Sequence, residues 1–133
     1  MSPQLQYSLL SLGYDESKGS PVFRFVVHEL ALGPMPYVFP EDSGLFLING
    51  LVHVFEDLTL TLVLLAPEGQ PMLRQEVKLQ PDPQSPSGRL ISVAFLEGLV
   101  FPTGGTYWIE IWSGSERWSR YPLDIEELEE GAP

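Results

Sequence analysis

The stretch Gly105-Thr106-Tyr107-Trp108-Ile109 follows a turn-forming Pro-Thr-Gly and opens a run of alternating aromatic and apolar residues. Such alternation is typical of a β-strand with one buried face. In two-sheet sandwiches a Tyr often lies at such a corner, with its hydroxyl bonded to backbone a few residues upstream and a Cys two residues later. That later position is Ile109 here, and the chain has no Cys. The stretch therefore predicts a sandwich without a disulfide, with Gly105 and Tyr107 as its structural corner.

Composition sets the outer bounds of the fold. The 133 residues suit one domain, and 44% hydrophobic with 19% charged residues is typical of a globular protein. Thirteen Pro and twelve Gly divide the apolar stretches into short pieces, which favours strands and turns. The absence of Cys excludes thiolate zinc sites and thiol nucleophiles. It fits a reducing, cytoplasmic location, although a secreted protein without disulfides is an open alternative.

The alternation and the turn signals predict about seven or eight strands. They cover residues 5–12, 22–32, 45–55, 58–65, 72–79, 89–96, 106–112 and 116–123. Closely spaced strands without helical crossovers favour an all-β, two-layer antiparallel sandwich, with a closed barrel as the competitor. Residues 13–19 are expected to form a loop. Asn49-Gly50 predicts either a hairpin turn or a bulge within one strand, and the bulge is preferred because each half would otherwise be very short.

The net charge of the chain indicates which classes of partner are disfavoured. A formal net charge of −11 disfavours nucleic acid and anionic membrane surfaces. The most apolar run, residues 58–65, is far shorter than the ~20 residues of a membrane helix. We expect a single sandwich domain over residues 1–123 and an acidic tail over 124–133, with at most one helical turn at 125–130. The tail is either solvated or a docking segment for a basic partner.

The sequence contains no recognisable catalytic or metal-binding motif. His28 and His53 lie on different predicted strands, with a spacing that matches no compact metal site. We therefore predict no catalytic residue, no metal and no cofactor. A small hydrolase stays open as a third option, because two carboxylates can meet in space without a sequence signature.

The terminal hairpin carries the candidate binding surface. Trp108, Glu110 and Trp112 share one face of their strand, opposite Tyr107 and Ile109. The next strand adds the remaining candidates, Arg117, Trp118 and Arg120. Outward aromatic side chains rimmed by charge are typical of protein-binding surfaces and of sugar-stacking platforms. The alternative is that the Trp side chains are covered by the tail or a loop, or pair across the hairpin.

These residues predict a non-catalytic protein-binding or assembly module. Self-association is weakly favoured, since the hairpin 106–123 is expected at a sheet edge. The alternative is a carbohydrate-binding module that uses Trp108, Trp112 and Trp118.

Several turn and corner segments also suggest a family. They are Pro36-Tyr37-Val38-Phe39-Pro40, Leu64-Leu65-Ala66-Pro67-Glu68-Gly69, Leu99-Val100-Phe101-Pro102 and Gly105-Thr106-Tyr107. Over residues 20–122 the chain resembles small uncharacterised bacterial proteins of immunoglobulin-like β-sandwich type. The resemblance implies the fold and carries over no catalytic or binding residue. Thr103 and Ile109 stand where the antibody-type corner has Asp and Cys, so the chain departs from true antibody domains.

Overall fold

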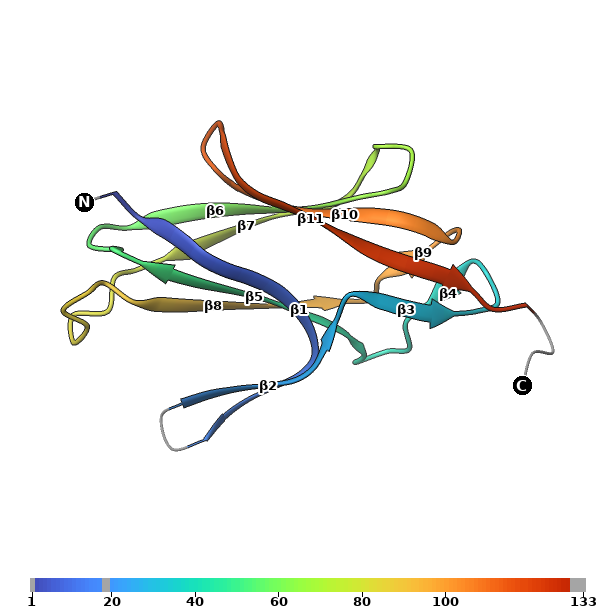
Figure 1. Ribbon diagram of the computed structural model, residues 1–133, viewed down its shortest axis with the longest axis horizontal. Helices are drawn as coiled ribbons and strands as arrows, with labels where there is room; N and C mark the ends of the chain where they lie inside the picture. Colours follow the sequence, from blue (N-terminus) through green and yellow to red (C-terminus); the bar gives the residue numbers. More distant parts are fainter. Residues whose placement is uncertain (1, 18–19, 130–133) are drawn as a thin grey trace.

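A computed structural model describes residues 2–17 and 20–129 (Figure 1). Its regular elements are all β-strands. They are β1 (Gln4–Ser17), β2 (Ser20–Val27), β3 (Glu29–Leu32), β4 (Tyr37–Val38), β5 (Gly44–Val52), β6 (Leu58–Leu65), β7 (Pro71–Leu79), β8 (Leu90–Glu97), β9 (Val100–Phe101), β10 (Gly105–Ser113) and β11 (Glu116–Glu127). Over these residues no helix is long and apolar enough to cross a membrane.

The strands form two facing sheets and one small ribbon. The four-stranded sheet has the order β2-β1-β5-β8, the five-stranded sheet β3-β11-β10-β6-β7, and β4 pairs with β9. All pairs are antiparallel except β11 with β3, which is parallel. The predicted two-layer sandwich is therefore confirmed. The described residues hold more strands than expected, because one predicted strand is divided and the β4–β9 ribbon was not predicted.

The core lies between the sheets and follows the alternation of the sequence. On β6, Leu60, Leu62 and Leu64 are almost fully buried, as are Leu45 and Leu47 of β5 on the facing sheet. Successive side chains of a strand point to opposite faces, so every second residue reaches the same core. The continuous core cluster draws on both sheets.

The corner predicted around Tyr107 is confirmed. The Tyr107 ring is fully buried, and its hydroxyl donates a hydrogen bond of 2.6 Å to the carbonyl oxygen of Thr103. The ring of Phe101 meets it edge-on, with 5.0 Å between the ring centroids. Gly105 has a φ of 137°, and a Cβ there would lie 2.9 Å from Cγ of Pro67. Glycine is therefore the residue that this turn requires.

The predicted strand 22–32 is divided between the two sheets, which corrects the expectation. Its first part is β2 of the four-stranded sheet, the chain bends at His28, and its second part is β3 of the five-stranded sheet. Strict alternation would place Phe25 on one face with Phe23 and Val27, but Phe25 has a φ of 59° and is 76% exposed. Alternation identifies which residues share a face of a strand, but it does not identify which sheet the strand joins.

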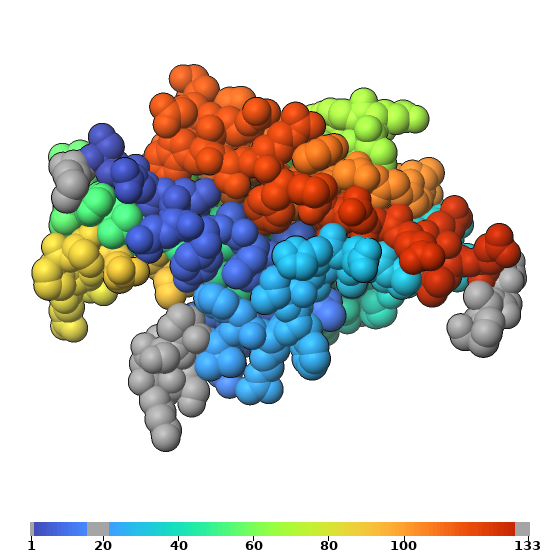
Figure 2. Space-filling model, viewed as in Figure 1, coloured from blue at the N-terminus to red at the C-terminus, as the bar shows by residue number. Residues whose placement is uncertain are grey.

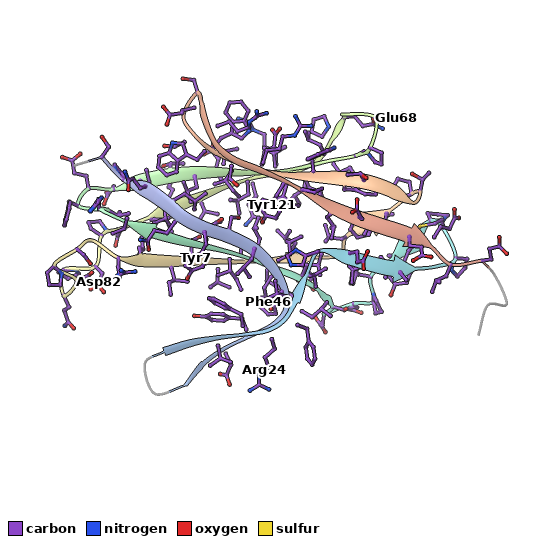
Figure 3. All side chains as sticks on the ribbon, viewed as in Figure 1. Tyr7, Arg24, Phe46, Glu68, Asp82 and Tyr121 are labelled. Atoms are coloured by element: carbon purple, nitrogen blue, oxygen red, sulfur yellow. The ribbon has the colours of Figure 1, made fainter. Side chains whose placement is uncertain are left out.

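The loop expected at residues 13–19 is wrong over the part that the structure describes. β1 continues to Ser17 and pairs with β2, and this hairpin turns away from the sandwich body (Figure 1). Its Tyr14 ring lies 6.4 Å from the ring of Phe46 on β5. Tyr7 and Phe46 lie on the side of the four-stranded sheet that faces the hairpin (Figure 3). Tyr14 therefore lies against the outer face of that sheet, and the far end of the hairpin projects away from it (Figure 1).

The stretch around Asn49-Gly50 belongs to one strand, as preferred. β5 runs unbroken from Gly44 to Val52, and no hairpin forms. The register shift lies instead in its neighbour β1, between Leu5 and Tyr7. The Tyr7 ring lies over Gly50, where any Cβ would overlap it.

The acidic tail expected from Asp124 is wrong at its start. β11 continues to Glu127 as the parallel neighbour of β3, and Ile125 is only 4% exposed. The expected helical turn at 125–130 is a strand up to Glu127. Burial decides this, because Leu123 and Ile125 are spaced by two and both reach the core. Residues 130–133 lie outside the described part of the chain.

This extension also moves the terminal hairpin away from the sheet edge. β11 is flanked by β3, and β10 is flanked by β6. The expected self-association through the edge of residues 106–123 therefore loses its basis.

Candidate functional site

The outer face of β10 carries the predicted aromatic residues. Trp108 and Trp112 are partly exposed on the side away from the core, whereas Ile109 and Ile111 are buried on the opposite side. Glu110 lies between the two Trp residues but is only 7% exposed, which the sequence did not predict. A buried carboxylate requires partners that replace its hydration.

Three side chains supply those partners. Trp112 Nε1 donates a hydrogen bond of 2.9 Å to Glu110 Oε1, and Arg117 Nη1 lies 3.3 Å from Glu110 Oε2. Arg120 Nε lies 3.7 Å from the same Oε2. Arg120 lies opposite Glu110 in the hairpin register, and Arg117 lies opposite Trp112. Oε1 is therefore engaged by a residue of the same strand, and Oε2 by two arginines that cross-strand pairing brings to the same face.

The Arg120 guanidinium also covers Trp108. Its Cζ lies 4.4 Å from the centroid of the indole ring, which is the geometry of a cation–π interaction. We call Trp108, Glu110, Trp112, Arg117 and Arg120 the Glu110 cluster. The buried carboxylate fixes the cations, and one cation in turn fixes an indole.

Trp118 does not belong to this face, which corrects the predicted site. The β10–β11 register shifts between Ile111 and Trp112, and Trp118 falls in that irregularity. Its ring packs against the core cluster, and its Nε1 donates a 2.7 Å hydrogen bond to Glu116 Oε1. Strict alternation assigns Trp118 and Arg120 to one face, but the extra residue changes the side on which Trp118 lies.

The rest of this face is built by β6 and β7. Glu110 pairs with Val63, which pairs with Arg74, and Trp112 pairs with Thr61, which pairs with Glu76. Val63 and Thr61 are each 8% exposed, so they form the floor of the surface.

This surface is locally basic on an acidic chain. Lys78 of β7 shares the face with Arg74, because it pairs with Thr59 two residues along β6. Four of the chain's seven basic residues therefore gather here. They are Arg74, Lys78, Arg117 and Arg120. Two acids, Glu76 and Glu110, lie among them, so the face carries a positive surplus while the whole chain carries −11.

A second set of polar side chains lies where the two sheets meet. The Tyr121 and Ser8 hydroxyls are 2.9 Å apart, and burial raises the pKa of Tyr121 to about 12 (Figure 3). Beside Ser8 in the register lie Asn49 and then Ser92, both on the inner side. The Asn49 amide has no hydrogen-bond partner in the described protein. Asn49 and Ser92 are buried in the interior, whereas Ser8 and Tyr121 are half-buried at its margin.

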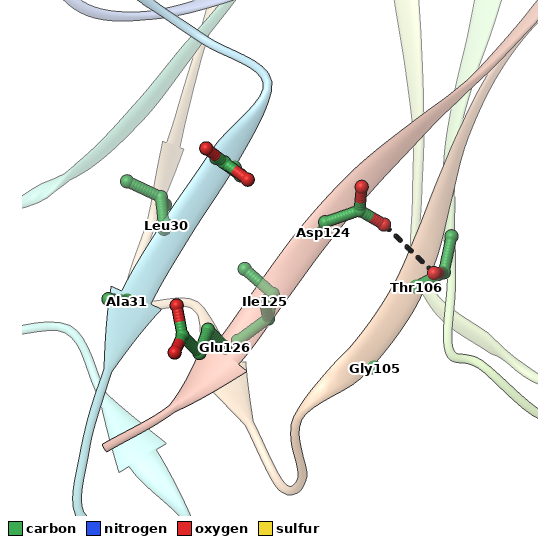
Figure 4. Close-up of a pocket in the computed structure, with 8 residues that line it drawn as sticks. Leu30, Ala31, Gly105, Thr106, Asp124, Ile125 and Glu126 are labelled. Carbon is green, nitrogen blue, oxygen red and sulfur yellow. Dashed lines mark hydrogen bonds between the residues drawn. The ribbon is translucent and has the colours of Figure 1, made fainter.

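An acidic groove lies along the parallel pair of β3 and β11 (Figure 4). Glu29, Asp124 and Glu126 line it, and Thr106 Oγ1 donates a hydrogen bond of 2.8 Å to Asp124 Oδ1. The described residues contain no group of three or more His, Asp or Glu side chains arranged to hold a metal ion. The front of the molecule, formed by β1, β2, β3 and β11, includes this region (Figure 2).

The architecture defines the class of protein: a disulfide-free, immunoglobulin-like β-sandwich. A similar solved structure is the crystal structure of an immunoglobulin-like protein from Pseudomonas aeruginosa, with a TM-score of 0.51 and 18% sequence identity. The alignment covers 95% of this chain and 98% of that one. The predicted resemblance to bacterial immunoglobulin-like proteins is thereby confirmed at the level of the fold. No protein-family model and no curated protein matches the chain.

Proposed function

We propose that the chain is a non-catalytic module that binds a protein partner on the outer face of its five-stranded sheet. The observation that supports this most is the Glu110 cluster. Two partly exposed Trp and two Arg side chains are held in place by one buried carboxylate. Trp and Arg are the residues that most often dominate protein interfaces, and side chains that are already ordered lose less entropy on binding.

The charge of the face suggests the chemistry of the partner. Arg74, Lys78, Arg117 and Arg120 favour a segment that presents carboxylates next to an apolar side chain for Trp112. The chain as a whole carries −11 and this face carries a positive surplus, so the remaining surface is acidic. An acidic partner is repelled elsewhere and attracted here, which orients the encounter.

The sugar-binding alternative is less well supported by the same geometry. A stacking platform needs open ring faces, but Arg120 covers one face of Trp108. Trp118 packs against the core and is separated from the other two rings. Only Trp112 keeps the role that the sequence suggested for three residues.

A hydrolase is disfavoured by the neighbours of Glu110. Glycoside hydrolysis requires a second carboxylate about 5–9.5 Å from the first. The cross-strand neighbours of Glu110 are Arg120 and Val63. Both oxygens of Glu110 are occupied by Trp112 and the arginines.

The test is site-specific photo-cross-linking in extract of the native host. A photoreactive residue at Glu76, on the proposed face, should cross-link one protein in a defined ratio. The same residue at Val38, which is 59% exposed on β4, is the matched control and should not. Adding Arg117→Ala to the Glu76 probe should remove the product, and binding of the purified partner should weaken with salt.

Equal labelling from both positions, or labelling that survives Arg117→Ala, would contradict the proposal. A titration of Trp fluorescence with a panel of oligosaccharides covers the alternative. Saturable quenching by an oligosaccharide that is lost in Trp112→Ala would show that the ligand of this face is a sugar and not a protein.

A further inference from the structure

The four free edges of the two sheets differ in how they are protected against pairing with another chain. Edge strands present unpaired backbone N–H and C=O groups, and proteins usually block them with charge, Pro, bulges or shortness. β3 has only four residues, and β2 is irregular at Phe25. β7 begins with Pro71, carries three charged side chains, and has a register shift beside Leu65 of β6.

β8 has none of these protections along its length. Among the described strands it pairs with β5 alone, in an unbroken register from Leu90 to Glu97. Its sequence, Leu-Ile-Ser-Val-Ala-Phe-Leu-Glu, contains no Pro and no charge before the final residue. Ile91 and Phe95 are 38% and 39% exposed, which is high for large apolar side chains. Regular, apolar and uncharged, this edge is suited to pairing.

We propose that β8 pairs antiparallel with β8 of a second copy of this chain, with the two-fold axis at Val93. In this register Ile91 lies opposite Phe95 of the second copy, and Arg89 lies opposite its Glu97. The symmetry repeats each contact, so two apolar pairs and two ion pairs flank a central Val–Val pair. The sequence of one strand is thus complementary to itself when reversed.

The alternatives in register are clearly worse. A shift by one residue would place outer-face side chains opposite core-facing ones, because side chains alternate with a period of two. A shift by two places Arg89 opposite Phe95, or Glu97 opposite Ile91, and loses both ion pairs. Because the pairing is two-fold symmetric, it closes as a dimer and leaves no β8 edge free for fibre growth.

The charge distribution permits this association. The acidic groove of β3 and β11 lies on the side where β1 meets β11, as the Ser8–Tyr121 contact shows. β8 lies at the opposite end of its sheet, beside β7, where a hollow is shared by Leu73 and Glu97. The three carboxylates of the groove therefore lie away from the proposed interface, and the repulsion between two chains of −11 is screened by salt.

The interface is independent of the proposed partner surface, because that surface lies on the other sheet. A dimer would leave both Glu110 clusters free. Either inference can therefore fail without affecting the other.

Charge reversal tests the register. The wild type should sediment as a monomer–dimer equilibrium up to millimolar concentration. Arg89→Glu and Glu97→Arg should each raise the dimer dissociation constant by roughly tenfold, since each places like charges together twice. The double variant should return it to near the wild-type value. Arg89 also donates to Gln6 Oε1 at 3.1 Å, so unfolding curves of all variants are the control for folding.

Disulfide cross-linking tests the position of the two-fold axis at Val93. Because the chain has no Cys, any disulfide must come from the introduced residue. Val93→Cys should oxidise to a covalent dimer, because residues at the axis lie directly opposite each other. Gln75→Cys on the β7 edge is the exposed control and should stay monomeric. A wild type that remains monomeric at millimolar concentration would overturn the proposal. So would equal cross-linking of both Cys variants, or a double charge reversal that restores nothing.

Discussion

The two faces of β10 differ in their chemistry, although they belong to one strand. The inner face presents Tyr107, Ile109 and Ile111, which are buried against the opposite sheet. The outer face presents Trp108, Glu110 and Trp112, where indoles surround a carboxylate paired with two arginines. The inner residues satisfy the core by apolar burial and one hydroxyl bond. The outer residues surround and pair the buried carboxylate of Glu110, a charge that the core of the fold does not require.

This difference is the basis for assigning stability to the inner face and the proposed binding to the outer face. A Val or Thr at position 110 would suit an outer strand position without any charged partner. Burying a carboxylate instead requires Arg117 and Arg120 to hold fixed positions, which costs side-chain entropy. The proposed binding function accounts for this arrangement, because a binding surface would present cations and indoles in one geometry. The predictions below test whether the inner face determines stability and the outer face determines binding.

The largest effect is expected from Ile111→Ala. Ile111 is fully buried, so the change removes apolar burial and leaves a cavity. The free energy of unfolding should fall by about 2–5 kcal/mol, measured by guanidinium denaturation. A loss well under 1 kcal/mol would show that the inner face of β10 is not part of a packed core.

Tyr107→Phe should have the next largest effect. The change keeps the ring and removes the hydroxyl that donates to the Thr103 carbonyl. The free energy of unfolding should fall by about 1–3 kcal/mol, since a partly buried acceptor loses its partner. Tyr37→Phe, which keeps a half-buried ring packed edge-on against Phe39, is the matched control and should be close to neutral. Equal effects of the two substitutions would argue against the corner.

Tyr121 should give an alkaline limit to stability. Burial raises its pKa from 10.0 to about 12, so the folded state favours the neutral phenol. This stabilisation is fully present below pH 10 and is lost as the pH rises towards 12. Absorbance at 295 nm should show one late-titrating Tyr, which Tyr121→Phe removes together with part of the alkaline sensitivity. A late titration that persists in Tyr121→Phe would assign it to another residue.

The sequence was sufficient for the parts of this fold that depend on local chemistry. The turn before Tyr107 predicted the corner and the run 58–65 predicted β6, because both depend on close neighbours in the chain. The path of residues 22–32 was not predictable in this way. Its alternation continues through His28, and the change of sheet depends on which distant strand is available to pair.

The part of the candidate site that depends on alternation within one strand was predicted, and the part that depends on a neighbouring strand was not. Trp108 and Trp112 were assigned to the outer face by alternation, whereas the burial of Glu110 depends on side chains from the next strand. Pairing the two strands outward from the turn would have placed Ser119 opposite Glu110. Arg120 reaches that position only through the register shift between Ile111 and Trp112. Trp118 was misplaced because an extra residue in β11 does not show in the pattern.

The most direct test of the division between the faces compares neighbours on one strand. Trp112→Ala should cost about 1–3 kcal/mol of unfolding free energy, less than Ile111→Ala, since it removes a partly exposed ring and one hydrogen bond to Glu110. The same variant should lose binding of the partner captured by the Glu76 probe, by at least about tenfold. Ile111→Ala, measured below its melting temperature, should keep that binding while losing stability. Wild-type affinity in Trp112→Ala, with the domain folded, would contradict the account.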